Sequence, residues 1–444
     1  MLTLRMVLPS IIRFLHIPMI LDRTIAPDFQ LIDSIQLPMA LSKKLANGNR
    51  LHIVNIGEQP VVRLECIFDA GTWYESQDNA AYFAIKMLME GTINRSYGQI
   101  SDAFERIGAF TEMSTGSDRV GIVVYCLSRF LPEVTEIISD LIQNAIIPEK
   151  ELEDVKNITL QNLRVNLEKT GYQAAVAFKA ALFGANHPYG KSHLEAKIVA
   201  VGVEEVRSHY QSFIKNGAFT VFIAGQISEL EVELIAKTLG GLEINPIQNK
   251  VLHPIEVNYA SKKILVEKQD SLQSTIRIGR ILFTRKHPDY FAMLVTNEIL
   301  GGYFGSRLMK NIREEKGLTY GISSHMVSQA NAGYFMIGAD VKKEFTQQTI
   351  DEIHKEIKRL QTELVSEDEL QTVKNFMAGE MAGSLNTAFE VADRRKTIIL
   401  DNLPTDFYDQ YVAKIRATSA EQVMEMANKY LKAEDMVEVV AGGK

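Results

Sequence analysis

The sequence repeats itself over a long distance, and this repeat limits the possible folds more than any local motif does. Three segments of the first half of the chain return in the second half, in the same order, at an offset that grows slowly from about 208 to about 218 positions. The matched segments are 82–84 with 290–292, Gly108 with Gly317, and 151–157 with 369–375. Collinear matches of this kind predict a duplicated unit of about 200 residues.

Strand-like and helix-like segments follow one another in both repeats. Short β-branched and aromatic runs predict strands, and longer runs with apolar residues at helical spacing predict amphipathic helices. The clearest predicted strands are 64–68, 120–127, 274–278 and 334–341, and the clearest predicted helices are 130–145 and 346–364. Because helices and strands do not alternate strictly, we expect an α+β fold of two homologous halves, each a mostly antiparallel sheet flanked by helices.

The predicted division of the chain has four parts. Residues 1–30 are expected to be a leader or extended N-terminal segment, and residues 31–245 the first domain. Residues 246–259 contain several Pro and Asn residues, which are typical of a linker. Residues 260–444 are then the second domain.

Composition is that of a soluble globular protein. Of the 444 residues, 46% are hydrophobic and 23% are charged, close to the average for such proteins. The formal net charge of −7 argues against a phosphate-binding surface, so we expect no nucleic-acid partner. Cys66 and Cys126 lie in apolar stretches and are expected to be free, buried thiols.

The N-terminal 21 residues are apolar and have a basic residue near their start, as a secretory signal would. However, Pro9, Arg13, His16 and Pro18 interrupt the run, and no clear small-residue cleavage site follows. No uncharged stretch is long enough for a membrane helix. We therefore expect no membrane contact and a cytoplasmic location. Met19 opens a more ordinary polar segment, so the residues before it are expected to be a leader or a misassigned start.

Local motifs for catalysis or cofactor binding are missing from the sequence. None of the nine histidines forms the i, i+4 pair that binds zinc from one helix. His187 and His193 flank a loop with Pro and Gly, where we expect exposed side chains rather than metal ligands. Gly301 and Gly302 follow a helix and are expected to form a turn rather than a nucleotide-binding loop. Composition and spacing alone indicate a duplicated protein with no recognisable catalytic group.

Several motifs nevertheless resemble the pitrilysin/insulinase family of zinc peptidases, in particular its mitochondrial-processing-peptidase-like branch. The resemblance extends over nearly the whole chain from about Leu31, and its most specific part runs from Leu300 to Tyr320. Further motifs that resemble the family are 71–75, 82–92, 186–190 and the strand end at Gly225. The resemblance implies the duplicated fold of these metallopeptidases.

The positions that bind zinc in this family carry other residues here. The family's motif H-x-x-E-H would fall on Tyr82, Ile85 and Lys86, and its third ligand, a glutamate, on Gln161 or Asn162. A lysine ammonium repels Zn²⁺, and no glutamate remains at the motif to activate water. The resemblance therefore implies that this chain has no cofactor of its own and does not hydrolyse peptides alone.

Two further departures from the family concern the same region and its repeat. The equivalent helix of the second half offers Tyr290, Met293 and Leu294, which are equally unsuited to a metal. On the strand that borders the family's active site, Glu112-Met113 replaces an Asn-Ala pair. We therefore expect the substrate edge to be altered.

Arg313 and Tyr320 fit an arginine and a tyrosine that hold substrate across the cavity in this family. Arg313 lies near a predicted helix end, Gly317 lets the chain turn, and Tyr320 starts the next strand. Both side chains could then face one cavity and polarise a substrate carbonyl. Alternatively, Arg313 caps the helix and Tyr320 packs as an ordinary strand aromatic. The sequence leaves both interpretations open.

In two-chain members of the family, one chain carries the zinc motif and the other carries the arginine and tyrosine. The resemblance therefore implies a non-catalytic subunit that binds peptide and completes the active site of a homologous, zinc-bearing partner. Metalloendopeptidase activity is expected only in that complex, with zinc in the partner. The alternative is a catalytically inactive peptide-binding or scaffolding protein that pairs with a second copy of itself.

Overall fold

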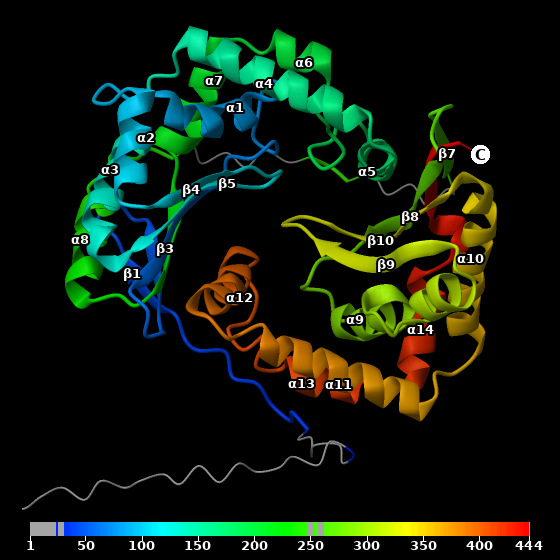
Figure 1. Cartoon of the computed structure of the whole chain (residues 1–444). Coiled ribbons are helices and arrows are strands. Elements are labelled where there is room, and N and C mark those ends of the chain that lie inside the picture. The colour runs from blue at the N-terminus through cyan, green and yellow to red at the C-terminus, as the bar shows by residue number, and fades with distance from the viewer. Residues whose placement is uncertain (1–23, 25–30, 247–252, 256–261, 444) are drawn as a thin grey trace, which may run out of the picture.

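The computed structural model of the chain describes residue 24 and residues 31–246, 253–255 and 262–443. Nearly all of the predicted leader and most of the predicted linker lie outside these residues. The described chain forms two sheets, each with its own layer of helices (Figure 1). None of the helices described is long and apolar enough to cross a membrane.

The first sheet has six strands in the order β1-β2-β6-β3-β5-β4. Its neighbours pair antiparallel except β2 and β6, which are parallel. The strands are β1 (Leu41–Lys44), β2 (Arg50–Asn55), β3 (Val61–Phe68), β4 (Phe110–Ser114), β5 (Val120–Leu127) and β6 (Phe219–Gly225). Since β4 pairs with β5 alone, its other side is a free edge of the sheet.

The second sheet has five strands in the order β7-β11-β8-β10-β9, with one parallel pair, β7 and β11. The strands are β7 (Lys262–Glu267), β8 (Gln273–Leu282), β9 (Thr319–Ser328), β10 (Gly333–Lys342) and β11 (Val437–Gly442). Apart from β1, the two sheets have the same strand order and the same single parallel pair. The predicted α+β fold of two homologous, mostly antiparallel halves is therefore confirmed.

The helices repeat in the same way. In the first half they are α1 (Ala80–Lys86), α2 (Tyr97–Arg106), α3 (Leu131–Asn144), α4 (Glu149–Leu167), α5 (Thr170–Phe183), α6 (Glu195–Ala200), α7 (Val203–His209) and α8 (Glu229–Gly240). In the second half they are α9 (Tyr290–Asn297), α10 (Thr346–Thr362), α11 (Glu367–Gly383), α12 (Ala388–Leu400), α13 (Tyr411–Ala417) and α14 (Ala420–Tyr430). Wider helical turns, η4 (Glu298–Gly302) and η5 (Met309–Glu315), follow α9.

The outer helices pack on the sheets through apolar residues that recur at helical spacing. In α10, Ile350, Ile353, Ile357 and Leu360 recur at helical spacing, and all four are buried in the core of the second half. The first half has a separate core, and a smaller apolar cluster joins the two halves around α5. Each half therefore has a core of its own, and four residues of the first half, Ile35, Leu37, Val54 and Ala224, also pack into the core of the second.

Each sheet also receives one helix from the other half, as Figure 1 shows for α12 beside the first sheet. Helix α5 of the first half contacts β11, β8 and β7, and helix α12 of the second half contacts β6 and β2. We call the face of each sheet that carries the other half's helix its inner face. This exchange of helices joins the two halves. The exchanged helix does not cover the part of each inner face that lies toward β4 or β9.

Candidate functional site

Helix α1 carries the three positions at which the family resemblance places the zinc motif. Ile85 is fully buried, and Lys86 points toward the edge strand, where its Nζ donates to the Met113 carbonyl over 3.4 Å. One turn earlier on the same face of the helix, the Tyr82 ring lies 4.8 Å from the ring of His193. This face therefore presents an ammonium and a phenol beside an imidazole.

The start of α1 is held by a buried polar network. Asn79 has a left-handed backbone, with φ of 72°, and its Oδ1 lies 2.6 Å from Nδ1 of His193. The Lys191 ammonium pairs with Glu75 at 3.1 Å and with Asp78 at 2.6 Å. A non-glycine residue in this backbone region costs free energy and persists only where its surroundings fix it. The network supplies that constraint.

The loop histidines are partly buried, so the expectation that they are exposed is wrong. The His187 ring stacks on Phe183 with centroids 5.7 Å apart, and it also meets the edge of Trp73. Burial is the main cause that lowers the pKa of both His187 and His193, which favours the neutral imidazoles. The Pro-Gly loop is drawn inward because it packs between α5 and Trp73 in the cluster that joins the halves.

The residues on α1 do not fit a zinc ion. A tetrahedral zinc site needs three converging nitrogen, sulfur or carboxylate ligands, whereas this helix offers a phenol and a cation. Gln161 and Asn162 are exposed on α4 and carry amides. Within the described part of the chain, no group of three or more His, Cys, Asp or Glu side chains could hold a metal ion.

The edge strand β4 borders a pocket of about 330 Å³ between the first sheet and α12. On its floor, Arg63 pairs with Asp393 of α12 and Glu65 with Lys396 of α12, both at 2.8 Å. Arg63 also pairs with Glu65 at 2.7 Å, and Lys396 with Asp393 at 2.9 Å. Glu112, on β4, is exposed and has no ion pair or hydrogen bond within the described chain. Strand β4 thus carries a carboxylate without an ion-pair partner in the described chain, next to four charged side chains that neutralise one another.

Arg313 and Tyr320 lie together, as their predicted role requires. Arg313 is on η5, Gly317 turns the chain with φ of 62°, and Tyr320 is the second residue of β9. The Arg313 guanidinium lies 5.1 Å from the centre of the Tyr320 ring and 4.7 Å from that of Phe304. Two aromatic rings therefore hold the guanidinium by cation–π contacts.

Tyr320 does not pack as an ordinary strand aromatic, because 89% of it is exposed, and Phe304 is 62% exposed. Arg313 retains its hydrogen-bond donors, since the described residues offer it no ion pair or hydrogen bond. The sequence reasoning missed Phe304, although its place between Gly302 and Gly305 marks a turn that can present a ring. The three side chains form one group at the surface, in which Arg313 is partly buried, and Arg313 and Tyr320 can donate hydrogen bonds to a carbonyl oxygen.

The glycines before this group have a different role from the predicted turn. A Cβ atom on Gly301 would lie 2.7 Å from the Ser324 hydroxyl, and one on Gly302 would lie 2.3 Å from the Glu298 carboxylate. Gly301 therefore needs to be glycine so that η4 can approach β9 closely, since the Ser324 backbone nitrogen would lie 2.8 Å from its Cβ, whereas at Gly302 the Glu298 side chain would have to move. Burial and the nearby Glu380 raise the pKa of Glu298 to about 7.

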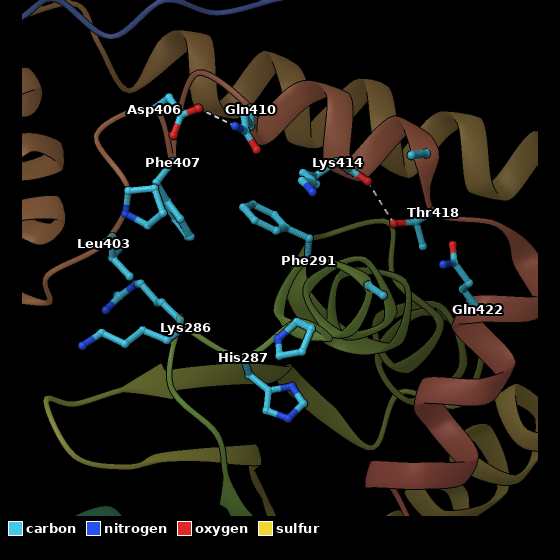
Figure 2. Close-up of a pocket in the computed structure, with 15 residues that line it drawn as sticks. Lys286, His287, Phe291, Leu403, Asp406, Phe407, Gln410, Lys414, Thr418 and Gln422 are labelled. Atoms are coloured by element: carbon cyan, nitrogen blue, oxygen red, sulfur yellow. Dashed lines mark hydrogen bonds between the residues drawn. The ribbon is translucent and has the colours of Figure 1, made fainter.

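A second pocket, of about 460 Å³, lies between α9 and α13 (Figure 2). Phe291 enters it from α9, Lys414 from α13, and Phe407 from the loop between α12 and α13. None of the site residues predicted from the sequence lines this pocket. It is therefore separate from the group around Arg313.

By architecture, the chain is a duplicated α+β protein in which β4 and β9 each have a free edge and a partly buried arginine lies between two exposed aromatic rings. A sequence profile of the insulinase family, peptidase family M16, matches residues 52–187, and a profile of the peptidase M16 inactive domain matches residues 200–377. The two matches together cover more than half of the chain. The chain belongs to the insulinase family of peptidases, and the predicted resemblance is confirmed.

Its relatives include zinc proteases and processing-peptidase subunits. The chain is 22% identical to an uncharacterized zinc protease of Bacillus subtilis, over 86% of this chain and 93% of that protein. It is 24% identical to the mitochondrial-processing peptidase subunit beta of Rattus norvegicus, over 87% of this chain and 81% of that protein. The crystal structure of a peptidase M16 inactive domain from Pseudomonas fluorescens has a TM-score of 0.81 at 23% identity and covers 91% of this chain and 98% of that one. This likeness shows the shared fold.

Proposed function

We propose that the chain is a non-catalytic subunit of a heteromeric zinc peptidase, in which it binds peptide and lends Arg313 and Tyr320 to a partner's active site. The observation that carries the proposal is the contrast between α1 and the group around Arg313. Helix α1 offers Tyr82 and Lys86, which cannot hold zinc, whereas Arg313 is held by two rings with its donors free.

The chemistry of Arg313 and Tyr320 suits a supporting role. A guanidinium and a phenol can donate hydrogen bonds to the oxyanion that forms when water attacks a peptide carbonyl. They cannot activate the water, which needs a metal or a general base. The zinc, when bound in a partner chain, would supply that activation. The name of the rat relative, a subunit, supports an assembly of this kind.

Peptide binding in this proposal uses the free strand edges. Strands β4 and β9 each pair with one neighbour, so each can accept an extended peptide through main-chain hydrogen bonds. Tyr320 lies at the start of β9, so a peptide on that edge would pass the Arg313 group. The edge and the donors would then act on the same ligand.

A cytoplasmic location is part of the proposal. Cys66 and Cys126 are both free and buried, which suits a reducing compartment. Cell fractionation of the native host tests this directly, and recovery of the chain with secreted or periplasmic markers would contradict it.

The decisive test mixes the chain with a homologous partner that has an intact H-x-x-E-H motif. Cleavage of short peptides should appear only in the mixture. Arg313→Ala with Tyr320→Phe should then lower kcat by roughly ten- to a thousandfold. A matched control replaces an exposed pair of the first half, Arg129→Ala with Tyr97→Phe, and should leave kcat unchanged.

Two outcomes contradict the proposal. Unchanged turnover in the Arg313 and Tyr320 variant would show that these residues do not serve the active site. Stoichiometric zinc in the purified chain, together with chelator-sensitive cleavage by the chain alone, would show that it is itself the peptidase. Self-association without any zinc-bearing partner would instead favour the homodimeric scaffolding protein.

A further inference from the structure

The inner face of the second sheet contains a cation that forms no ion pair with any residue the structure describes. Arg277 on β8 is half-buried, and the one hydrogen bond of its guanidinium goes to the carbonyl of its neighbour Ile276, at 3.0 Å from Nη1. No ion pair within the described chain involves Arg277. A half-buried guanidinium with four unused donors has the capacity to bind an anion.

The strand register shows where this guanidinium lies. Arg277 is paired with Gly338 on β10, and Gly338 is paired with Ser323 on β9, so the three residues form one row across the sheet. A Cβ atom on Gly338 would lie 2.6 Å from Nη1 of Arg277. The arginine side chain therefore lies over the glycine, on the way from β8 to the edge strand.

At the edge, two polar side chains continue the row. Ser323 and His325 are on the same face of β9 because side chains alternate along a strand, and their neighbours Ile322 and Ser324 are buried on the other face. The Ser323 hydroxyl lies 2.9 Å from Nε2 of His325. Both groups can donate a hydrogen bond to a ligand beside β9.

The nearest acid, Asp340, is engaged elsewhere. Its Oδ1 accepts a hydrogen bond from the Thr275 hydroxyl over 2.5 Å, and that hydroxyl also meets Thr170 of α5. Burial lowers the pKa of Arg277, against the charge of Asp340, which raises it. Burial is also the main cause that lowers the pKa of His325, and the charge of Arg277 lowers it further. A positive potential therefore reaches the edge strand.

We propose that Arg277, Ser323 and His325 form a binding site for a carboxylate side chain of a peptide that pairs with β9. The site rests on the proposed peptide-binding function and adds a preference to it, for an Asp or Glu in the bound segment. Ser323 lies three positions after Tyr320 on β9, across a register shift of that strand, so the two residues are at most about 10 Å apart. The acidic residue would thus lie a few positions from the residue held by Arg313 and Tyr320.

The test uses the full-length chain and fluorescent peptides with capped ends, built of Ala, Ser and Val and long enough to span the ten residues of β9. One set carries a single Glu that is moved along the peptide, and its twin set carries Gln. Fluorescence anisotropy should show roughly tenfold tighter binding of the Glu peptides, as expected for one charge-assisted hydrogen-bonded pair. The preference should appear at alternate positions, because only these face Arg277.

Three variants decide whether Arg277 causes the preference. Arg277→Gln removes the charge, and Gly338→Ala displaces the guanidinium without removing it, so both should bring the Glu-to-Gln ratio close to one. Lys286→Gln removes an exposed lysine of the same half and should leave the ratio unchanged. If Arg277→Gln does not fold, Gly338→Ala alone decides.

The failures of the two proposals are distinguishable. Equal binding of Glu and Gln peptides to the unaltered chain overturns the carboxylate site and leaves peptide binding intact. A preference that persists in Gly338→Ala also overturns it. Failure of every peptide to bind overturns peptide binding by this chain and the carboxylate site with it.

Discussion

The two halves share a fold and differ in the chemistry of their inner faces. Glu65 on β3 and Arg277 on β8 occupy equivalent positions in the two sheets. Each is paired with the residue that lies three positions before the glycine at the end of the neighbouring strand, β6 or β11. Glu65 is neutralised by Arg63 and by Lys396 of the exchanged helix, whereas Arg277 has no ion-pair partner among the residues described. The shared topology therefore does not fix the charge of the inner face, and the second half is the one with an unpaired cation.

The exchanged helices differ in the same way. Helix α12 meets the first sheet through ion pairs and through the Arg119 bond to the Leu400 carbonyl, at 2.7 Å. Helix α5 meets the second sheet through an apolar cluster that includes Phe178 and Phe183. We call these contacts the ionic seam and the apolar seam. Apolar burial stabilises directly, whereas the attraction within a buried ion pair is largely offset by the cost of desolvating its charges. The comparison therefore predicts that the apolar seam contributes most of the stability between the halves.

The largest expected effect is the loss of an aromatic ring from the apolar seam. Phe178 is 1% exposed, and Phe178→Ala should cost about 3–5 kcal/mol of unfolding free energy through lost burial and the cavity left behind. Urea denaturation followed by the fluorescence of Trp73 measures this, because Trp73 is the sole tryptophan and lies in the same cluster. Phe304→Ala, at an exposed position, is the matched control and should change the stability by less than about 0.5 kcal/mol. Equal losses in both variants would show that α5 does not stabilise the second sheet.

In the ionic seam, replacing one buried charge should lower the stability more than replacing two. Arg63→Met leaves the buried carboxylate of Glu65 with Lys396 alone and should cost about 3 kcal/mol. Arg63→Met with Glu65→Met removes both buried charges and should recover much of that loss, since Asp393 and Lys396 still pair at 2.9 Å. The same urea denaturation measures both variants. If the double variant is less stable than the single one, the charges stabilise the seam beyond mutual neutralisation.

The repeated Val-Lys-Asn pattern gives a third comparison. Lys156 on α4 donates to the carbonyls of Val199 and Val201 at the end of α6, and Lys374 on α11 donates to the Arg416 carbonyl at the end of α13. Each lysine thus satisfies the carbonyls that a helix end leaves unpaired. Lys156→Met should cost about 2 kcal/mol and Lys374→Met about 1 kcal/mol, because Lys156 makes two such bonds. Urea denaturation measures both variants. If they lose the same unfolding free energy, the number of hydrogen bonds does not explain the difference.

These lysines also show how far sequence reasoning reaches. The repeat was visible because the same buried contact imposes the same residues on both halves, and strand 120–127 was predicted with the bounds of β5 because its apolar run is continuous. Local patterns carry such information. The bounds of the predicted linker stay a prediction, since most of it lies outside the described residues.

The site could be predicted only in part. Arg313 and Tyr320 are close in the sequence and resemble a known motif, so their proximity was expected. Arg277, Gly338 and Ser323 are far apart in the sequence and meet only through the strand register, which no local pattern reveals. The one available signal was Gly338 inside a predicted strand, since a strand glycine often marks the close approach of another group. Likewise, a Pro-Gly loop does not reveal what it packs against, and His187 and His193 were therefore placed wrongly at the surface.

A last prediction concerns acid, which should weaken the first half before the second. His209, at the end of α7, is buried with its Nε2 2.8 Å from the Ala70 carbonyl, and burial lowers its pKa to about 4. Because the unfolded chain binds this proton near the ordinary pKa of 6.5, the folded state should lose about 1.4 kcal/mol per pH unit between pH 6.5 and 4. His52, also in the first half, has a pKa lowered to about 4 by burial and by Arg50, whereas His287, His325 and His354 of the second half are at least partly exposed.

Hydrogen exchange at pH 7.5 and 5.5, corrected for intrinsic rates, separates the two halves in this respect. Acid should lower the protection of β2, β3 and β6 more than that of β8 and β10. His209→Gln keeps a side-chain donor for the Ala70 carbonyl but cannot take up the proton, so it should reduce the pH dependence in the first half and leave the second half unchanged. If acid lowers protection equally in both halves, or if His209→Gln leaves the pH dependence intact, the buried histidine is not its cause. Carboxylates shared by both halves, whose protonation weakens ion pairs such as those of Asp393, would then be the alternative.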